Sequence, residues 1–354
     1  MKKVLLATTM LVATASMAAA EVKISGYGRF GLDYNSGNTI PPAPGVGLTT
    51  TYPGKTTLTS RLRIQFDMSA ETDGGVALGA RLRLQTESRD NTVSGGAANG
   101  TTTANGARFY ARAGGFTLQV GNIVGAVEGM SGLYLETRTA DIGIDGAGFE
   151  SIVANVNGEA FNWDSYSSGG TGVNGVEVFY SAGAFSTQVS YSQRNDSISG
   201  AAPGVITSGL DRAAINVSYA FGDWTAALAY QDSSAMWEDK LVVSVQGDLG
   251  PVGVRLAYAD NDGIGKFGLY GNMDVGAASN ILLYVTNEDA VSAADVALGR
   301  NDNRDAVAGS NMREGTGYGI HYSYDLGGGA SFEAGARRAS NGNNTAQAGV
   351  YFSF

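Results

Sequence analysis

The residues of this chain that could do chemistry are charged side chains rather than nucleophiles or metal ligands. The 354-residue sequence contains no Cys and one His, His321. The lack of Cys excludes disulfides, thiol nucleophiles and iron–sulfur clusters, and a single His excludes sites that need several imidazoles. His321 and Ser323 have the spacing of a possible hydrolase pair, but they alternate with apolar Ile320 and Tyr322 and so share the polar face of one strand. We expect no catalysis and no cofactor.

One acidic motif has the outline of a metal site. Asp260-Asn261-Asp262-Gly263 resembles the start of a calcium-binding loop. Later positions of such a loop must also supply ligands, including a bidentate Glu at the twelfth position. This sequence has Ile264 at the fifth position and Gly271 at the twelfth. The motif therefore predicts a tight polar hairpin and no metal.

The largest group of carboxylates lies in one long segment, residues 123–175, whose only basic residue is Arg138. Acidic residues suit a solvated loop equally well, but apolar Ile142, Phe149 and Phe161 indicate a segment that packs on another part of the protein. We therefore expect this segment to fold inward. Its acidic residues are Glu128, Glu136, Asp141, Asp145, Glu150, Glu159 and Asp164.

Arginines recur on one side of several alternating segments. In residues 57–69 and 76–87 the apolar side chains occupy even positions, and the arginines occupy odd ones. On a membrane-spanning strand a cation facing lipid at the midplane costs about 2–4 kcal/mol, so the arginines are expected on the water-filled side. Local pairing with Asp67, Glu87 or Glu333 stays open as an alternative to one continuous basic wall. The candidate wall contains Arg29, Arg61, Arg63, Arg81, Arg83 and Arg337, and Arg108, Arg112 and Arg255 share its parity.

Strands must position these side chains, and alternation between apolar and polar residues runs along most of the sequence. Seven short turns alternate with eight longer polar connections, so fifteen connections join sixteen strands. After residue 20 no apolar run approaches the roughly 20 residues that a membrane helix needs. Short turns at one end and long loops at the other are typical of transmembrane barrels. The sequence predicts an all-β fold: a 16-stranded antiparallel transmembrane β-barrel with an inward-folded third loop.

The first twenty residues have the pattern of a signal peptide. Lys2 and Lys3 precede an uncharged stretch, and Ala18-Ala19-Ala20 supplies the small residues of a cleavage site. We therefore predict a signal peptide at 1–20 and a barrel domain at 21–354. Asp and Glu outnumber Lys and Arg by 33 to 23, which argues against a nucleic-acid partner.

With these features in order, the chain resembles the trimeric general-diffusion porins of Gram-negative bacteria, in particular the alphaproteobacterial, Rhodobacter-like type. The resemblance implies an outer-membrane location, a homotrimer and a third loop, residues 123–175, that forms the constriction. The matching motifs are Glu-Val-Lys-Ile-Ser-Gly at 21–26, Thr-Asp-Gly-Gly-Val at 72–76, Tyr-Ser-Ala-Gly-Ala-Phe-Ser at 180–186, Tyr-Asp-Leu-Gly-Gly-Gly-Ala at 324–330 and the terminal Phe354.

The combined interpretation is a channel for passive diffusion of small hydrophilic solutes and ions, in which an acidic loop faces an arginine-rich wall. A substrate-selective channel for sugars or anions is the alternative. A sugar channel would need a continuous aromatic track, and the lumen-parity aromatics form no such series. A plugged structural barrel is disfavoured by the many small residues expected inside. The lumen-parity aromatics are Tyr27, Tyr110, Phe179 and Tyr284.

Small residues on the outward parity predict where subunits meet. Small side chains gain little from lipid contact but allow another protein surface to approach closely. They gather on the first, fifteenth and sixteenth predicted strands, which would form the seam of the barrel. We therefore expect the threefold axis of a homotrimer beside this seam. The residues are Gly26, Gly28, Ala334, Ala336, Ala346 and Ala348.

Overall fold

The computed structural model describes residues 20–37, 54–89, 98–135, 162–195, 197–198, 206–207, 209–300, 303, 314–340 and 342–354. The predicted signal peptide lies outside these residues except for Ala20, as does the middle of the acidic segment. Within the described part of the chain, no helix is long and apolar enough to cross a membrane.

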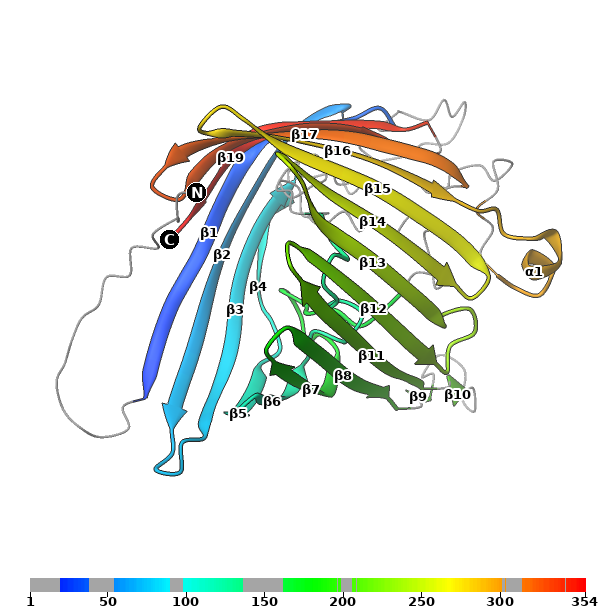
Figure 1. The fold of residues 1–354 in the computed structure, drawn as a ribbon. Helices are drawn as coiled ribbons and strands as arrows, with labels where there is room; N and C mark the ends of the chain where they lie inside the picture. Colours follow the sequence, from blue (N-terminus) through cyan, green and yellow to red (C-terminus); the bar gives the residue numbers. More distant parts are fainter. Residues whose placement is uncertain are drawn as a thin grey trace, which may run out of the picture.

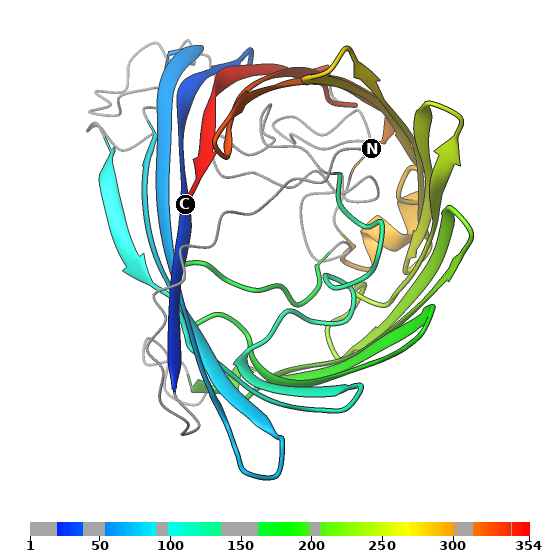
Figure 2. The ribbon, with the colours of Figure 1, turned by 60° about the vertical axis from the view of Figure 1, so that its left-hand side comes forward.

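The described strands form one closed antiparallel barrel, as predicted (Figures 1 and 2). β1 (Glu21–Asn35) pairs with β2 (Thr56–Glu71) on one side and with β19 (Asn344–Ser353) on the other, which closes the sheet. β3 (Ala77–Arg89) pairs with both β4 (Ala98–Ala104) and β5 (Arg108–Ala113), so these two make one interrupted strand. Counted in this way, the described residues contain sixteen barrel strands.

The remaining barrel strands follow one another in chain order around the sheet. A separate two-stranded ladder, β9 (Ser197–Ile198) with β10 (Ile206–Thr207), and the short helix α1 (Ala293–Ala297) lie in connections. The other barrel strands are β6 (Phe116–Asn122), β7 (Asn174–Ala182), β8 (Phe185–Arg194), β11 (Leu210–Phe221), β12 (Trp224–Ser233), β13 (Lys240–Leu249), β14 (Val252–Asn261), β15 (Ile264–Val275), β16 (Ser279–Glu288), β17 (Gly315–Gly327) and β18 (Ala330–Arg338).

The alternation of β2 shows which side chains point outward and which point into the barrel. Leu58 and Leu62 are 61% and 39% exposed on the outer surface, whereas Thr59 and Arg61 between them are 4% and 8% exposed on the inner side. Successive side chains of a strand point to opposite faces, so one register fixes which residues meet lipid. Apolar residues outside and polar residues inside are the arrangement that a membrane barrel requires.

One connection differs from the sequence prediction and one agrees with it. The polar composition of residues 89–105 predicts one of the eight long loops, but this stretch contains β4, which lengthens the fourth strand. The motif at Asp260 is a tight hairpin, as expected: Asp262 and Gly263 have positive φ values of 54° and 90°, and the Asp260 carboxylate accepts the Gly263 N–H at 2.8 Å.

The outward glycines of β1 are covered by rings of the same chain. An ideal Cβ at Gly28 would lie 2.3 Å from the Phe352 ring, and one at Gly26 would lie 2.7 Å from the Phe354 ring. The expectation that these glycines present a small, open surface is therefore wrong. They are small because the last strand lays its aromatic side chains across them.

We predict that Gly28→Val destabilises the barrel, because the new side chain would overlap the Phe352 ring. Overpacking of this kind costs about 1–3 kcal/mol. The measurement is the thermal unfolding midpoint in detergent, followed by circular dichroism. Adding Phe352→Ala to Gly28→Val should recover part of the loss, and Gly74→Ala, in an open turn, should leave the midpoint unchanged. A single Gly28→Val variant as stable as the parent would contradict the packing described here.

Candidate functional site

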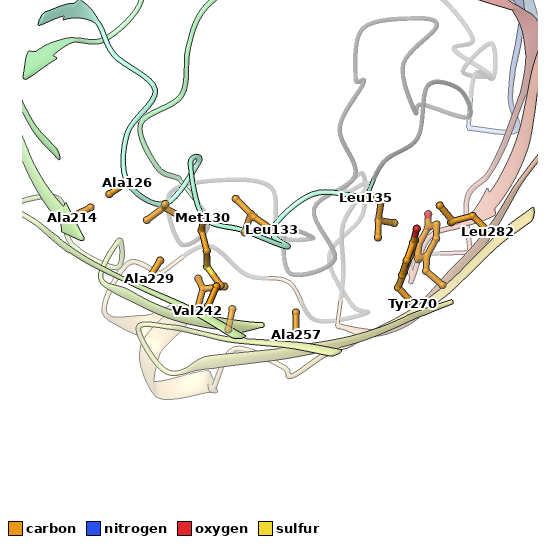
Figure 3. Packing of buried hydrophobic residues seen from close by; sticks show 14 residues of the cluster. Ala126, Met130, Leu133, Leu135, Ala214, Ala229, Val242, Ala257, Tyr270 and Leu282 are labelled. Atoms are coloured by element: carbon orange, nitrogen blue, oxygen red, sulfur yellow. The ribbon is translucent and has the colours of Figure 1, made fainter. Parts of the chain in front are cut away.

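The segment after β6 runs inside the barrel and packs on its wall (Figures 2 and 3). Val127, Met130, Leu133 and Leu135 are at most 4% exposed, and they form a hydrophobic cluster with the inner faces of β11 to β16. Inner positions of that wall carry the small side chains that the sequence predicts inside, together with apolar Val242, Tyr270 and Leu282. These small side chains leave room for the segment to approach the sheet. The wall residues of the cluster are Ala214, Ala227, Ala229, Val242, Ala257, Ala259, Tyr270, Leu282 and Tyr284.

A buried carboxylate on β7 holds the start of this segment, residues 123–135, which we call the outgoing arm. The two carboxylate oxygens of Glu177 accept the backbone N–H groups of Val124 at 3.0 Å and Gly125 at 2.9 Å. Gln188 donates to the same carboxylate at 2.7 Å. Glu177 is 1% exposed, so these donors replace the water that its charge would otherwise require. The carboxylate therefore fixes where the arm leaves the wall.

Further contacts hold the outgoing arm along its length. The Ala126 N–H donates to Ser190 at 2.8 Å, and Asn216 donates to the Ala126 carbonyl at 2.6 Å. At the far end, Ser244 donates to the Ser131 carbonyl at 2.7 Å. The arm is thus bonded to β8, β11 and β13 in turn, which keeps it close to this side of the barrel.

The returning part of the segment, residues 162–173, is the return arm, and it is fixed to the opposite flank of β6. Asn105 and Asn122 both donate to the Ser167 carbonyl, at 2.8 Å and 2.9 Å, and Asn122 also accepts the Ser167 N–H at 3.2 Å. Arg83 donates to Ser168 at 3.1 Å. The interruption between β4 and β5 falls at Asn105, where the strand turns its amide towards the arm.

An ionic network joins the beginning of the return arm to β11. Arg212 contacts Asp164 at 3.1 Å and Glu238 at 2.7 Å, and Ser192 donates to Asp164 at 2.6 Å. Burial raises the pKa of Glu238, but hydrogen bonds from Arg212 and Ser233 and the charge of Arg212 outweigh it, so its pKa lies below the usual value. The ion pair with Arg212 therefore persists in mild acid.

Two of the seven predicted acidic residues lie in the described arms, and both are bonded locally. Asp164 is 4% exposed and pairs with Arg212, not with the predicted basic wall. Glu128 accepts hydrogen bonds from Tyr134 and Trp163, which joins the two arms, and burial raises its pKa above the usual value. The other five lie outside the described residues: Glu136, Asp141, Asp145, Glu150 and Glu159.

The predicted basic wall divides into two groups. Arg29 and Arg63 have their guanidinium carbons 5.6 Å and 4.9 Å from the centroid of the Tyr27 ring, and Arg61 lies directly opposite Arg29 across the β1–β2 ladder. We call these three residues, Arg29, Arg61 and Arg63, the upper cluster. Tyr351 stacks on Tyr27 with a centroid distance of 5.2 Å.

The second group follows β3 and β5. Arg81 forms an ion pair with Asp67 at 2.6 Å, which agrees with the local pairing left open above. Arg83 and Arg108 both lie over the ring of Tyr166 in the return arm, at 4.4 Å and 4.3 Å. Arg337, on β18, is half-buried and donates to Thr345 across the β18–β19 ladder at 3.3 Å.

The remaining candidate residue, His321, is paired with a carboxylate of the barrel wall. His321 lies on the inner face of β17 with its Nε2 atom 3.0 Å from a carboxylate oxygen of Glu333 on β18. The histidine therefore contacts a wall carboxylate and not Ser323. Among the described residues there is no cluster of three His, Asp or Glu side chains that could hold a metal ion.

Sequence reasoning missed the residues that anchor the arms. Parity places Glu177, Arg212 and Tyr27 on the inner side, but it gives no partner for them. Tyr166 belongs to a loop, where no periodicity applies. The one available signal for the anchoring wall was the run of inward alanines on β11 to β14, where small side chains leave room for a segment to pack.

A closed barrel with an apolar outer band, charged inner walls and a segment bonded inside it defines a membrane-channel protein. Residues 7–344 match the family model described as Gram-negative porin, and the chain belongs to that family. It is accordingly an outer-membrane diffusion channel and not an enzyme.

Individual porins resemble it along most of its length. A porin from Fuscovulum blasticum is 29% identical over 294 residues, which cover 79% of this chain and 88% of that protein. A porin from Rhodobacter capsulatus is 27% identical over 348 residues, which cover 94% and 100%. The solved structure of a variant of the Rh. blastica porin matches with a TM-score of 0.68 at 24% identity, over 94% of this chain and 100% of that one.

We predict that Glu177→Ala loosens the outgoing arm, because it leaves two buried backbone N–H groups without an acceptor. Each such group costs about 1–3 kcal/mol. Single-channel recordings should show increased open-channel current noise, and the unfolding midpoint should fall. Glu177→Gln should have a smaller effect, since it keeps one acceptor oxygen but loses the charge.

Glu333→Gln is the matched control for this prediction, because Glu333 is also a buried wall carboxylate but contacts His321 and not the arm. Equal noise in the Glu333 and Glu177 variants would show that the effect does not come from the arm.

Proposed function

We propose that this porin, exported by a signal peptide at residues 1–20, passes small hydrophilic solutes and ions through a lumen narrowed by residues 123–175. The observation that carries the proposal is that both described arms of this segment bond to inner walls. The outgoing arm bonds to β7, β8, β11 and β13, and the return arm bonds to β3–β6, β8 and β11. A segment held at both roots inside the barrel reduces the passage, whereas an outward loop would leave it open. We accordingly propose three segments: a signal peptide at 1–20, a barrel domain at 21–354 and, within the barrel domain, a constriction loop at 123–175.

We further propose that charges of opposite sign face one another across the narrowing. The upper cluster, Arg29, Arg61 and Arg63, supplies the basic side. Because Glu128 and Asp164 are bonded within the protein, the acidic side must come from Glu136, Asp141, Asp145, Glu150 and Glu159. Such a transverse field favours polar and dipolar solutes over apolar ones, since ordered water is costly for apolar groups to displace.

We predict that the double change Arg61→Gln and Arg63→Gln shifts ion selectivity towards cations. The measurement is the reversal potential in planar bilayers under a potassium chloride gradient. The shift should shrink at 1 M salt, where the Debye length is about 3 Å. Arg112→Gln, at the short-turn end of β5, is the control and should move the potential less. An unchanged potential in the double variant would remove these two side chains from the pore lining.

The same recordings separate a general pore from a selective one. The ion conductance of a general pore rises in proportion to salt concentration, because the pore holds no ion tightly. Conductance that saturates, or block by a sugar at millimolar concentration, would favour the substrate-selective alternative.

Tyr110 and Tyr284 lie flat over Gly79 and Gly319, where a Cβ would be 2.4 Å from each ring, so both rings are pressed against the wall.

We propose a homotrimer whose subunits meet at the seam of β18, β19, β1 and β2. A hollow on the outer surface supports this position: it is lined by Phe30, Leu32 and Leu58 around the small Ala348. Large apolar side chains surrounding a small one form a socket that a neighbouring subunit can fill. The glycines of β1 contribute less than expected, since Phe352 and Phe354 cover them.

We predict that Ala348→Trp weakens the trimer, because the indole fills the socket. The variant should run as a monomer on mild-detergent gels at a temperature that the parent trimer survives, while the barrel keeps its circular dichroism spectrum. Ala226→Trp, an outward alanine on β12 across the barrel, is the control and should leave the trimer intact. A trimer of unchanged heat resistance in Ala348→Trp would place the interface on another wall.

A further inference from the structure

Tyr166 in the return arm contacts two cations of the barrel wall with one ring. The guanidinium carbon of Arg83, on β3, lies 4.4 Å from the ring centroid, and that of Arg108, on β5, lies 4.3 Å from it. Both distances are well within the range of about 6 Å over which a cation is attracted to an aromatic face. One loop residue therefore makes cation–π contacts with two guanidinium groups that belong to different strands.

The ring, and not the hydroxyl group, makes these contacts. The Tyr166 hydroxyl is buried and has no hydrogen-bond partner in the described part of the chain. A phenylalanine ring at this position would preserve the cation–π contacts and lose nothing that the hydroxyl supplies. This separation of ring from hydroxyl makes the role of the residue testable by substitution.

Other bonds hold the ring at this place. Arg83 donates to Gln65 at 2.8 Å and to Ser168 at 3.1 Å, while Asn105 and Asn122 hold the carbonyl of Ser167. Ser167 and Ser168, directly after the ring, are thus fixed to the wall, and Asp164, two residues before it, pairs with Arg212. The ring therefore has little freedom to swing away from the two arginines.

The positive charge of these two arginines is not met by an ion pair within the described part of the chain. Among the described residues, neither Arg83 nor Arg108 forms an ion pair, and the nearby Asp67 is already paired with Arg81 at 2.6 Å. Arg81 also lies directly opposite Arg108 across the β3–β5 ladder, so like charges are adjacent here. The ring therefore stabilises both cations in a region that is rich in positive charge, beside the hydrogen bonds that Arg83 donates.

We propose that Tyr166 is a specificity-determining residue of the channel: its ring holds Arg83 and Arg108 against the wall and withholds their charge from passing anions. The inference rests on the proposed pore function and deepens it. Both arginines then lie beneath the return arm, in contact with its aromatic ring. The channel is less attractive to anions than its arginine content alone would suggest.

The test compares Tyr166→Leu with Tyr166→Phe in planar bilayers, by reversal potential in a chloride gradient near 0.1 M, where the Debye length is about 10 Å. Removing contacts of cation–π strength changes the population of the docked guanidiniums by about two- to fivefold. We expect Tyr166→Leu to raise the chloride-to-potassium permeability ratio about twofold, and Tyr166→Phe to leave it as in the parent. Adding Arg83→Gln to Tyr166→Leu should bring the ratio back towards the parent value.

Three outcomes would overturn the proposal: no shift in Tyr166→Leu, equal shifts in the Leu and Phe variants, or a Leu shift that Arg83→Gln does not reduce. Folding is checked by circular dichroism, and Tyr166→Gln replaces Tyr166→Leu if the latter does not assemble. The Arg61 and Arg63 double variant distinguishes the two levels of the argument. If that variant moves the potential and Tyr166→Leu does not, only this inference fails; if neither does, the proposed basic wall fails as well.

Discussion

The structure depends on one constraint: in lipid every backbone N–H and C=O group must find its partner within the protein. Closing β1 on β19 removes the free edges of the sheet and satisfies this constraint for all the barrel strands together. Closure also divides the side chains into an outer and an inner set, because strand residues alternate. Nearly all the charge of the strands is thereby collected in the interior, where water is available.

The interior then has to be organised without the packed core of a soluble protein. Its hydrophobic cluster lies between the outgoing arm and the inner face of β11–β16, and the arm supplies five of the fourteen buried residues. Burial of Met130, Leu133 and Leu135 stabilises the arm in the way that burial stabilises any core. A barrel wall of small side chains and an apolar loop arm are two parts of one packing arrangement.

Polar contacts fix where the two arms attach to the barrel wall. Glu177 fixes the root of the outgoing arm, Asn105 and Asn122 fix the return arm, and the network of Asp164, Arg212 and Glu238 joins the return arm to β11. The arms consequently pair with charged side chains that would otherwise face the lumen. Asp164 and Glu128 are bonded within the protein, and Arg83 and Arg108 contact the Tyr166 ring. The electrostatic potential of the pore therefore cannot be obtained by counting its charged residues.

The sequence by itself determined the barrel, its sixteen strands, the ends at which turns and loops lie, and the inward direction of the arginines, because a period of two and the cost of charge in lipid act on each strand separately. It also indicated that residues 123–175 pack on the protein. Only the tertiary structure decided that Asp164 meets Arg212, that Tyr166 lies between Arg83 and Arg108, and that Phe352 covers Gly28. Those contacts depend on the stagger between strands and on the path of a loop through the interior, and neither follows from the alternation of side chains along one strand.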